Sequence, residues 1–207
     1  MSVKINIKEI NTVLSSEDLI FLNDILKKEN SDSILANLSM DLLKKYFQTL
    51  INSKNIFLFF CKSNNRNVGY AIFTNKPSFL INEFQDLKYS ILVNLIYNFK
   101  IKAIINILFS VLRLDMIFLG DKKKRIISEN LNLNLLAIKS EFQSKGIGKK
   151  FVEEAIVYLK KNSDCKFITV ETNDNRTEDF YKKKLKFYYI GKKIRFFKNL
   201  NIFCKDL

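Results

Sequence analysis

Histidine is absent from this chain of 207 residues, and proline and glycine are scarce, with one and five copies. Only three cysteines are present, Cys61, Cys165 and Cys204, and none of them stands close to another. Without histidine no Cys-His cluster can form, so we predict neither a zinc site nor a disulfide framework, and a reducing compartment fits. The opening residues, MSVKINIKEI, lack the apolar core of a signal peptide, so we expect a cytoplasmic protein.

Because proline and glycine are few and apolar residues are many, the composition excludes a disordered chain. Hydrophobic residues make up 47% of the sequence, and 19 of them are phenylalanine. This composition supplies a sizeable core, and the length is typical of one domain. No linker or internal repeat divides the chain, so we predict a single domain over residues 1–207.

Acidic residues are outnumbered, with 21 Asp and Glu against 35 Lys and Arg, which gives a formal net charge of +14. Such a charge favours polyanionic partners in general. The basic residues are scattered, however, and the abundance of Lys, Asn and Ile together is what an AT-rich genome produces. A nucleic-acid interface requires a clustered basic patch, so we do not expect nucleic-acid binding.

Long charge-free hydrophobic runs are also missing, although residues 76–130 contain a strongly apolar stretch. Four basic residues interrupt it: Lys88, Lys100, Lys102 and Arg113. No run approaches the roughly 20 residues of a membrane-spanning helix. We predict two amphipathic helices instead, near 86–98 and 101–114. Three roles remain open for residues 86–114: covering the core, pairing with a second subunit in a homodimer, or peripheral contact with a membrane.

The first 75 residues predict the order strand, helix, helix, strand, strand. Val3, Ile5 and Ile7 alternate with polar residues as in a strand. In SSEDLIFLNDILKKEN, Ser15 and Asp18 are spaced as a capping box, and SMDLLKKYFQTLINS repeats the pattern of a capped amphipathic helix. NIFLFFC and VGYAIFT then read as a hairpin around KSNNRN.

The last 80 residues predict an alternation of strands and helices. NLNLNLLAI and KFITVET are strand-like, and KGIGKKFVEEAIVYLKK and TEDFYKKKL are helix-like. FYYIGKKIRFFKN predicts a hairpin that turns at Gly191. This alternation indicates an α/β domain with a mixed sheet that is partly parallel in its second half.

Two of the five glycines, Gly146 and Gly148, lie in the turn QSKGIGKK between a predicted strand and a predicted helix. The turn fits neither the P-loop pattern nor the dinucleotide fingerprint. Glycines let backbone N–H groups approach phosphate oxygens, the following helix adds its positive end, and Lys145, Lys149 and Lys150 add charge. The turn therefore predicts a diphosphate site; the alternative is an ordinary strand-to-helix turn.

Two segments resemble the GCN5-related N-acetyltransferase (GNAT) family. LLAIKSEFQSKGIGKKFVEEA resembles the family's acetyl-CoA motif, a strand with a bulge followed by Q/R-x-x-G-x-G/A. VETNDNRTEDFYKKKLKF resembles the later family segment N-x-x-A-x-x-F-Y-x-x-x-G-F. The resemblance implies a mixed sheet flanked by helices, with residues 76–130 as a helical insertion between the third and fourth strands.

The resemblance also implies cofactor-binding positions for acetyl-CoA. Leu136, Ala137 and Ile138 would offer backbone groups to the pantetheine arm. The pyrophosphate would be surrounded by Gln143, Ser144, Lys145, Gly146, Ile147 and Gly148, with Lys149 and Asn175 as further contacts near the cofactor.

This chain departs from the family pattern at four positions. Asp174 stands at the usual Asn, between Asn173 and Asn175, and Thr177 stands at the usual Ala. Lys186 replaces a glycine, which implies a reshaped turn into the next strand. Asn132 stands where many members carry a glutamate.

Amide formation from an amine and a thioester needs a proton donor for the thiolate and an acceptor for the amine's proton. The resemblance places Tyr181 near the sulfur, where it could act as the acid. Asn132 and Asn134 share a strand face and could hold a water or the acceptor's hydroxyls. Without histidine, the available carboxylates are Glu129 and Glu171, although we expect both on the solvated surface.

We therefore predict an acetyl-CoA-dependent N-acetyltransferase that acts on the primary amine of a small acceptor. The polar strand face favours an amino sugar, and a protein or peptide amine is nearly as well supported. By analogy with the family, residues 76–130 would set specificity. A non-catalytic protein with this fold, which binds CoA or docks on a membrane or partner, is the remaining alternative.

Overall fold

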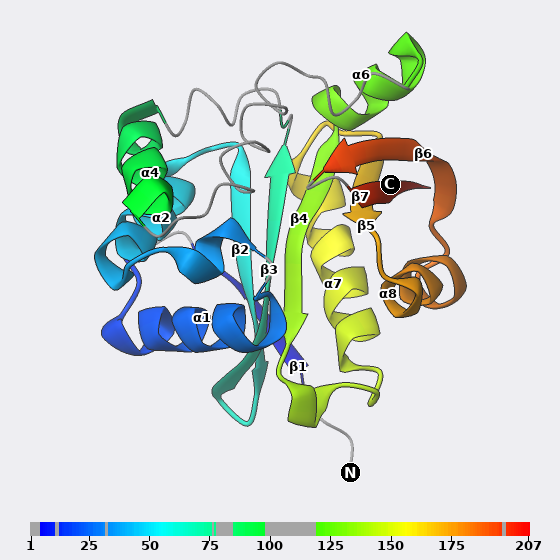
Figure 1. Ribbon diagram of the computed structural model, residues 1–207. Coiled ribbons are helices and arrows are strands. Elements are labelled where there is room, and N and C mark those ends of the chain that lie inside the picture. The colour runs from blue at the N-terminus through cyan, green and yellow to red at the C-terminus, as the bar shows by residue number, and fades with distance from the viewer. Residues whose placement is uncertain are drawn as a thin grey trace.

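The computed structural model describes residues 5–10, 13–31, 33–75, 77, 85–97, 119–195 and 198–207. Within these residues seven strands form one mixed sheet in the order β1-β2-β3-β4-β5-β7-β6, with helices on both faces (Figure 1). The strands are β1 Ile5–Glu9, β2 Ile56–Ser63, β3 Arg66–Asn75, β4 Leu131–Ile138, β5 Phe167–Thr172, β6 Tyr188–Arg195 and β7 Lys198–Asp206. This is the mixed α/β sheet flanked by helices that the sequence predicts.

Helices α1 (Ser16–Glu29) and α2 (Met40–Asn52) begin where their capping residues predict. The Ser15 side chain accepts from the Asp18 backbone N–H, and Asp18 accepts from Ser15 in return, which completes the capping box. Ser39 caps α2, and a short 3-10 helix (Ile34–Asn37) joins the two.

β2 and β3 form the predicted hairpin. Ser63 pairs with Arg66, and the two residues between them, Asn64 and Asn65, have φ of 49° and 61°. Asparagine tolerates this left-handed conformation better than most residues, and a two-residue turn of this kind matches the twist of the strands.

Two helices are described between β3 and β4. Helix α4 (Gln85–Tyr97) agrees with the helix predicted near 86–98, and α6 (Asp121–Glu129) precedes β4. The helix predicted at 101–114 lies outside the described residues. α4 buries Leu95 but exposes Tyr89, Val93 and Ile96, so its solvent side is apolar as well, contrary to the predicted amphipathic pattern. No helix in the described parts of the chain is both long and apolar enough to cross a membrane.

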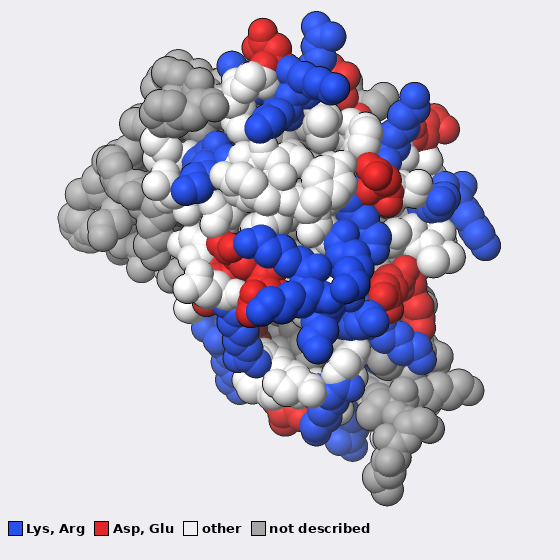
Figure 2. Space-filling view, turned by 90° about the vertical axis from the view of Figure 1, so that its right-hand side faces the viewer, with Lys and Arg blue, Asp and Glu red and all other residues white. Residues whose placement is uncertain are grey.

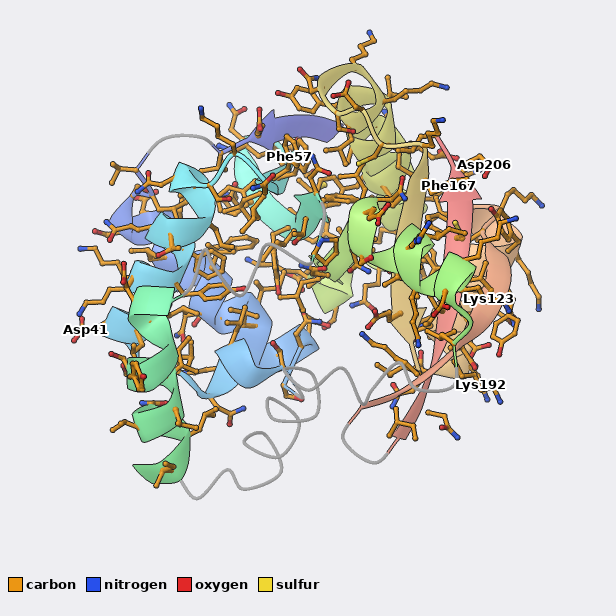
Figure 3. All side chains as sticks on the ribbon, turned by 90° about the horizontal axis from the view of Figure 1, so that it is seen from above. Asp41, Phe57, Lys123, Phe167, Lys192 and Asp206 are labelled. Atoms are coloured by element: carbon orange, nitrogen blue, oxygen red, sulfur yellow. The ribbon has the colours of Figure 1, made fainter. Side chains whose placement is uncertain are left out.

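The core lies on both faces of the sheet. On one face α1 and α2 pack over β2 and β3, through residues such as Leu26, Phe47 and Phe60. On the other face α7 (Ile147–Asn162) packs over β2 to β5, through residues such as Phe151 and Phe59. Viewed from above, α2 with Asp41 and α4 lie at one side of the molecule and β5 with Phe167 at the other (Figure 3).

The C-terminal half ends in α8 (Asn175–Asp179), a π-helix (Phe180–Lys184) and the antiparallel strands β6 and β7. The hairpin predicted to turn at Gly191 is wrong in its turn position. Gly191 lies inside β6 and pairs with Ile202. A Cβ atom at Gly191 would stand 2.5 Å from Leu119 Cδ2, so this glycine makes room for Leu119 instead of forming a turn.

β4 and β5 run parallel but pair over three residues only. Leu131, Asn132 and Leu133 pair with Ile168, Thr169 and Val170, and no further pairs follow. On its other edge β4 stays paired with β3 as far as Ile138. The second half of β4 therefore has an open edge toward β5, and this edge leads to the glycine turn.

Candidate active site

The open edge of β4 begins at a bulge. Ile72 of β3 pairs with Leu135 and Phe73 pairs with Leu133, so Asn134 is the extra residue. A bulge increases the local twist of its strand, which explains why β4 leaves β5 at this point. Backbone groups of residues 135–138 that point toward β5 have no strand partner there. These include the predicted pantetheine contacts Leu136, Ala137 and Ile138.

The glycine turn follows β4 and begins α7. Gly146, the N-cap of the helix, has φ 78°, and Ser144 has φ 59°. The first helical bond runs from the Lys150 N–H to the Gly146 carbonyl, 3.1 Å. Within the described residues, the backbone N–H groups of residues 144–149 donate no hydrogen bond. A helix N-terminus with unpaired N–H groups is a natural anion site.

The side chain of Gln143 is used inside the protein. Its Nε2 donates to the Ile138 carbonyl at 2.7 Å and to Glu29 Oε2 at 2.9 Å. Gln143 therefore ties the turn to the end of β4 and to the end of α1. The same bond uses one of the two lone pairs of the Ile138 carbonyl oxygen.

Three lysines surround the turn, as the sequence predicts. Lys145 Nζ donates to the Glu141 carbonyl at 2.7 Å, and Lys149 pairs with Glu153 at 3.7 Å. Lys150 makes a similar exposed pair with the next glutamate. Exposed pairs of this kind contribute little to stability, so these lysines can turn toward an anion.

Arg176 of α8 reaches the turn from the other side. Its Nη2 donates to Ser144 Oγ at 3.4 Å. Lys and Arg side chains gather across the middle of the face that carries α8 (Figure 2). Arg176 thus adds a fixed charge beside the unpaired N–H groups, a contribution that the sequence analysis did not assign.

Tyr181 lies in the π-helix, with its ring packed between Phe180 and Phe187 at centroid distances of 5.2 and 5.6 Å. The side chain is only 4% exposed, and burial raises the pKa of its phenol above the ordinary value. Within the described residues no hydrogen bond of its hydroxyl is seen, so the phenol proton is not engaged by a neighbouring group there.

The π-helix and the glycine turn meet at Gly148. A Cβ atom there would lie 3.7 Å from both Ile138 Cγ1 and Phe180 Cζ. The end of β4, the first turn of α7 and the residue before Tyr181 thus converge, and π-helical turns of this kind are frequent at functional sites.

Asp174 is the N-cap of α8. Its Oδ2 accepts from the Thr177 hydroxyl at 2.7 Å and from the Thr177 backbone N–H at 2.8 Å. These hydrogen bonds lower the pKa of the Asp174 carboxyl, and the bond from the Thr177 hydroxyl has the largest effect. Asp174 and Thr177 therefore replace the family's Asn and Ala by forming a cap. Asn175 is the first residue of α8 and is exposed.

Lys186 has φ 62°, the left-handed conformation that glycine adopts without strain. We predicted a reshaped turn because lysine replaces glycine here. The turn at Lys186 is closed by the Phe187 N–H, which donates to the Tyr181 carbonyl at 3.0 Å, and its reshaping relative to the family stays a prediction.

A row of polar side chains crosses the sheet beside the bulge. Asn132 Nδ2 donates to Thr169 Oγ1 at 3.0 Å, and Asn134 Nδ2 donates to Thr74 Oγ1. Asn132 is buried, whereas Asn134 is exposed. The predicted polar face exists, but its amide N–H groups already bind threonines, so Asn134 is the member that can meet an acceptor.

Glu171 does not lie on the solvated surface, contrary to our expectation. It is the first β5 residue beyond the pairs with β4, and it binds Lys193 Nζ at 2.6 Å. Its side chain is 12% exposed, and that of Lys193 is 9% exposed. By alternation along β5, Glu171 shares the sheet face of Thr169.

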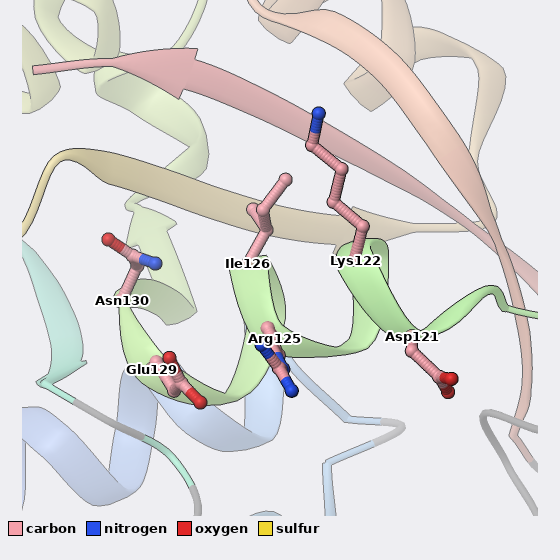
Figure 4. Close-up of a pocket in the computed structure, with 6 residues that line it drawn as sticks. All are labelled: Asp121, Lys122, Arg125, Ile126, Glu129 and Asn130. Carbon is pink, nitrogen blue, oxygen red and sulfur yellow. The ribbon is translucent and has the colours of Figure 1, made fainter.

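Glu129 is the last residue of α6 and is exposed, as expected. It lines a surface pocket of about 460 Å³ along this helix (Figure 4). The other lining residues are Asp121, Lys122, Arg125, Ile126 and Asn130. This pocket carries charges of both signs and is not lined by residues of the glycine turn, so a catalytic role for Glu129 stays a prediction.

Sequence reasoning missed Glu29 and Arg176 as neighbours of the turn. Arg176 stands five residues before Tyr181, inside the second motif, so its basic charge beside a predicted phosphate site was a usable signal. Glu29 lies 114 residues before Gln143, and no local pattern connects them.

Comparisons with known proteins agree with this geometry. Residues 122–187 match the profile described as the acetyltransferase (GNAT) family. No curated protein sequence matched the chain.

Solved structures match over nearly the whole chain. Agmatine N-acetyltransferase in an apo form has a TM-score of 0.63 at 10% identity, with 99% of this chain and 100% of that chain covered. A ribosomal-protein-alanine N-acetyltransferase from Brucella melitensis has a TM-score of 0.59 at 12% identity, with coverage of 98% and 99%. NAA60 from Arabidopsis thaliana, in complex with acetyl-CoA, has a TM-score of 0.56 at 14% identity, with 99% of each chain covered.

Identities this low show the fold alone, and the sequence match adds the region from α6 to the start of β6. The bulged β4 and the glycine turn lie where the first sequence motif predicts them. Residues 122–187 thus match the GNAT acetyltransferase family in sequence, and the chain as a whole shares its fold with solved N-acetyltransferases.

Proposed function

We propose that this protein is an acetyl-CoA-dependent N-acetyltransferase that acts on the primary amine of a small polar acceptor. One observation carries the proposal. The unpaired N–H groups of residues 144–149 stand at the end of the open β4 edge. A diphosphate at the turn leaves the attached pantetheine arm free to run along residues 136–138.

The residues of the turn fit the diphosphate. Gly146 is left-handed, and a Cβ atom there would meet nothing within 4 Å, so the approach to the turn is unobstructed. Arg176 and Lys149 add positive charge on two sides. The Glu29 carboxylate is bonded to the segment before the turn, through Ser140 and Gln143.

Bound acetyl-CoA supplies the acetyl thioester. Unpaired N–H groups on the open edge of β4 donate to the thioester carbonyl and polarise it. The Tyr181 hydroxyl donates a hydrogen bond to the departing sulfur. Because burial raises the phenol's pKa, the hydroxyl keeps its proton over the physiological range and stabilises the thiolate mainly as a donor.

The acceptor arrives as an ammonium ion and must lose a proton before its nitrogen attacks. Glu129 stands two residues before β4, and Asn132 lies between it and the bulge. A water held by Asn132 and Asn134 connects the amine to a carboxylate in this proposal. The pH dependence of kcat/KM tests it: if Glu129 takes the proton, Glu129→Gln removes the acidic limb, and Glu171→Gln retains it.

An amino sugar fits the exposed amide of Asn134 beside the open edge, which the buried Thr74 hydroxyl holds in place. A protein or peptide amine is the second candidate. Among the similar structures, one is named for agmatine, a small-molecule amine, and one for a ribosomal-protein alanine, so the fold is found with small-molecule and with protein acceptors.

Acetyl-CoA binding and free-thiol release decide the proposal. We expect titration calorimetry to detect acetyl-CoA binding, and thiol release to rise with at least one member of a panel of amino sugars, polyamines and peptides. Binding without turnover on any amine would instead support a non-catalytic CoA-binding protein. Absence of binding would refute the site itself.

A further inference from the structure

The carboxylate of Glu29, at the end of α1, holds the segment that leads into the glycine turn. Oε1 accepts from the Ser140 N–H at 3.1 Å and from the Ser140 hydroxyl. Oε2 accepts from Gln143 Nε2 at 2.9 Å. One side chain therefore holds both the first residue of the short 3-10 helix Ser140–Phe142 and its C-cap, Gln143.

Glu29 occupies a position where a carboxylate is unfavourable by itself. It is the last residue of α1, beside the helix's unpaired carbonyl groups, whose partial negative charge disfavours a carboxylate. Within the described residues no Lys or Arg pairs with it. Neutral donors from Ser140 and Gln143 thus make up its hydrogen-bonding environment.

The bond to Gln143 determines the path of the chain after β4. Gln143 Nε2 bridges Glu29 and the Ile138 carbonyl, so the side chain closes a loop from the end of β4 back onto itself. The next residue, Ser144, takes a left-handed conformation, and the unpaired N–H groups begin there. The loop is therefore held before the amides that face the ligand.

We propose that Glu29 is a positioning residue for the cofactor. It fixes Ser140 and Gln143 so that the N–H groups of residues 144–149 stay unpaired and aligned, and it does not touch the cofactor itself. The inference rests on the proposed function, since it concerns how the diphosphate turn is prepared for acetyl-CoA.

The sign of the effect separates this role from a plain charge effect. A carboxylate near a diphosphate repels it, so removal of the charge alone should tighten acetyl-CoA binding. Loss of a residue that positions the turn should weaken binding, because the amides must then be ordered when the ligand binds. The two roles predict opposite changes in Kd.

Four proteins test the inference: the natural chain, Glu29→Ala, Glu29→Gln and the control Asp24→Ala. Asp24 is exposed on the same helix, and its replacement by alanine changes the net charge by the same amount. Within the described residues its side chain makes no hydrogen bond or ion pair. We expect the acetyl-CoA Kd to rise roughly tenfold in Glu29→Ala, since hydrogen bonds to a charged group are lost. Glu29→Gln keeps one acceptor oxygen, so its Kd should lie between those of the natural chain and Glu29→Ala. Asp24→Ala should bind acetyl-CoA as the natural chain does.

Kinetics supply a second readout. Glu29→Ala should raise KM for acetyl-CoA and leave kcat at saturating acetyl-CoA unchanged, because Glu29 contacts no reacting atom. If Glu29 acts through Gln143, the double variant Glu29→Ala with Gln143→Ala should bind no more weakly than the weaker single variant. Tighter or unchanged binding in Glu29→Ala would overturn the inference.

Hydrogen exchange of the ligand-free protein keeps this test separate from the proposed function. We expect the bonded amides of Ser140, Phe142 and Gln143 to exchange faster in Glu29→Ala and at an unchanged rate in Asp24→Ala. Unchanged exchange would overturn the positioning role whether or not acetyl-CoA binds. If exchange is faster in Glu29→Ala but the natural chain binds no acetyl-CoA, the proposed function is wrong while Glu29 still holds the turn.

Discussion

Lys193 of β6 reaches across β7 and binds Glu171 of β5, with Nζ and Oε1 2.6 Å apart. Both side chains are almost buried, at the point where β5 stops pairing with β4. Two charges in such a place stabilise each other as a pair, because their attraction offsets part of the hydration that each loses on burial.

Lys193→Met should therefore destabilise the protein by roughly 2–4 kcal/mol, because it leaves the Glu171 carboxylate buried without its cation. Urea unfolding at pH 7 measures the change. Lys192→Met is the matched control, since Lys192 is the exposed neighbour on the same strand, and we expect less than about 0.5 kcal/mol there. Equal effects of the two substitutions would show that the pair contributes nothing specific.

Gly146→Glu should abolish acetyl-CoA binding. The left-handed φ of 78° strains any other L residue, and the new carboxylate would stand beside the diphosphate. Gly148→Ala is the control, because its Cβ would make ordinary contacts at 3.7 Å and the helix begins there. Calorimetric titration with acetyl-CoA should show near-normal affinity for Gly148→Ala. Normal affinity in Gly146→Glu would refute the turn as the diphosphate site.

Tyr181→Phe should lower kcat by roughly 10²-fold and change acetyl-CoA affinity little, because a general acid or donor acts on the departing sulfur. Thiol release and calorimetry measure the two quantities. Tyr189→Phe serves as the control: Tyr189 is 49% exposed and packs against Phe203. An unaffected rate in Tyr181→Phe would remove this residue from the mechanism.

Asp174→Ala should cost about 1 kcal/mol at pH 7, because α8 loses its N-cap, whereas Asp174→Asn keeps a capping oxygen. The folded-state pKa of Asp174 is lowered from 3.8, so the charged cap stabilises the fold fully above pH about 4. That stability is lost as the pH falls through the folded pKa. Urea unfolding measures the free energy of unfolding of the natural chain and of Asp174→Asn. We expect the natural chain to be the more stable at pH 7 and this advantage to disappear at low pH. A difference that does not change with pH would contradict the role of the charged cap.

Most of the local structure could be predicted because its causes are local. The Ser15 capping box and the Ser39 cap set the starts of α1 and α2, and each depends on residues within one turn. The glycine turn was found for the same reason: Gly146 and Gly148 lie between a strand and a helix, and their chemistry can be recognised from eight residues. The second motif placed Tyr181 on a short helix in the same way.

Long-range contacts explain what the sequence could not show. Glycine is typical of turns, but Gly191 lies inside β6, where Leu119 packs against it. Glutamate is typical of the protein surface, but Lys193 reaches Glu171 across a neighbouring strand and binds it. Lys186 keeps a left-handed conformation that its residue type disfavours, because the bond from Phe187 to Tyr181 holds the turn.

The amino-acid sequence by itself determined the position of the glycine turn and predicted a diphosphate there, because such a turn is a short, contiguous feature. Only the tertiary structure decided which partners hold that turn. Glu29 and Arg176 arrive from opposite ends of the chain, and the end of pairing between β4 and β5 depends on a bulge at Asn134. Contacts of this kind follow from how the strands are ordered in the sheet, which no local pattern encodes.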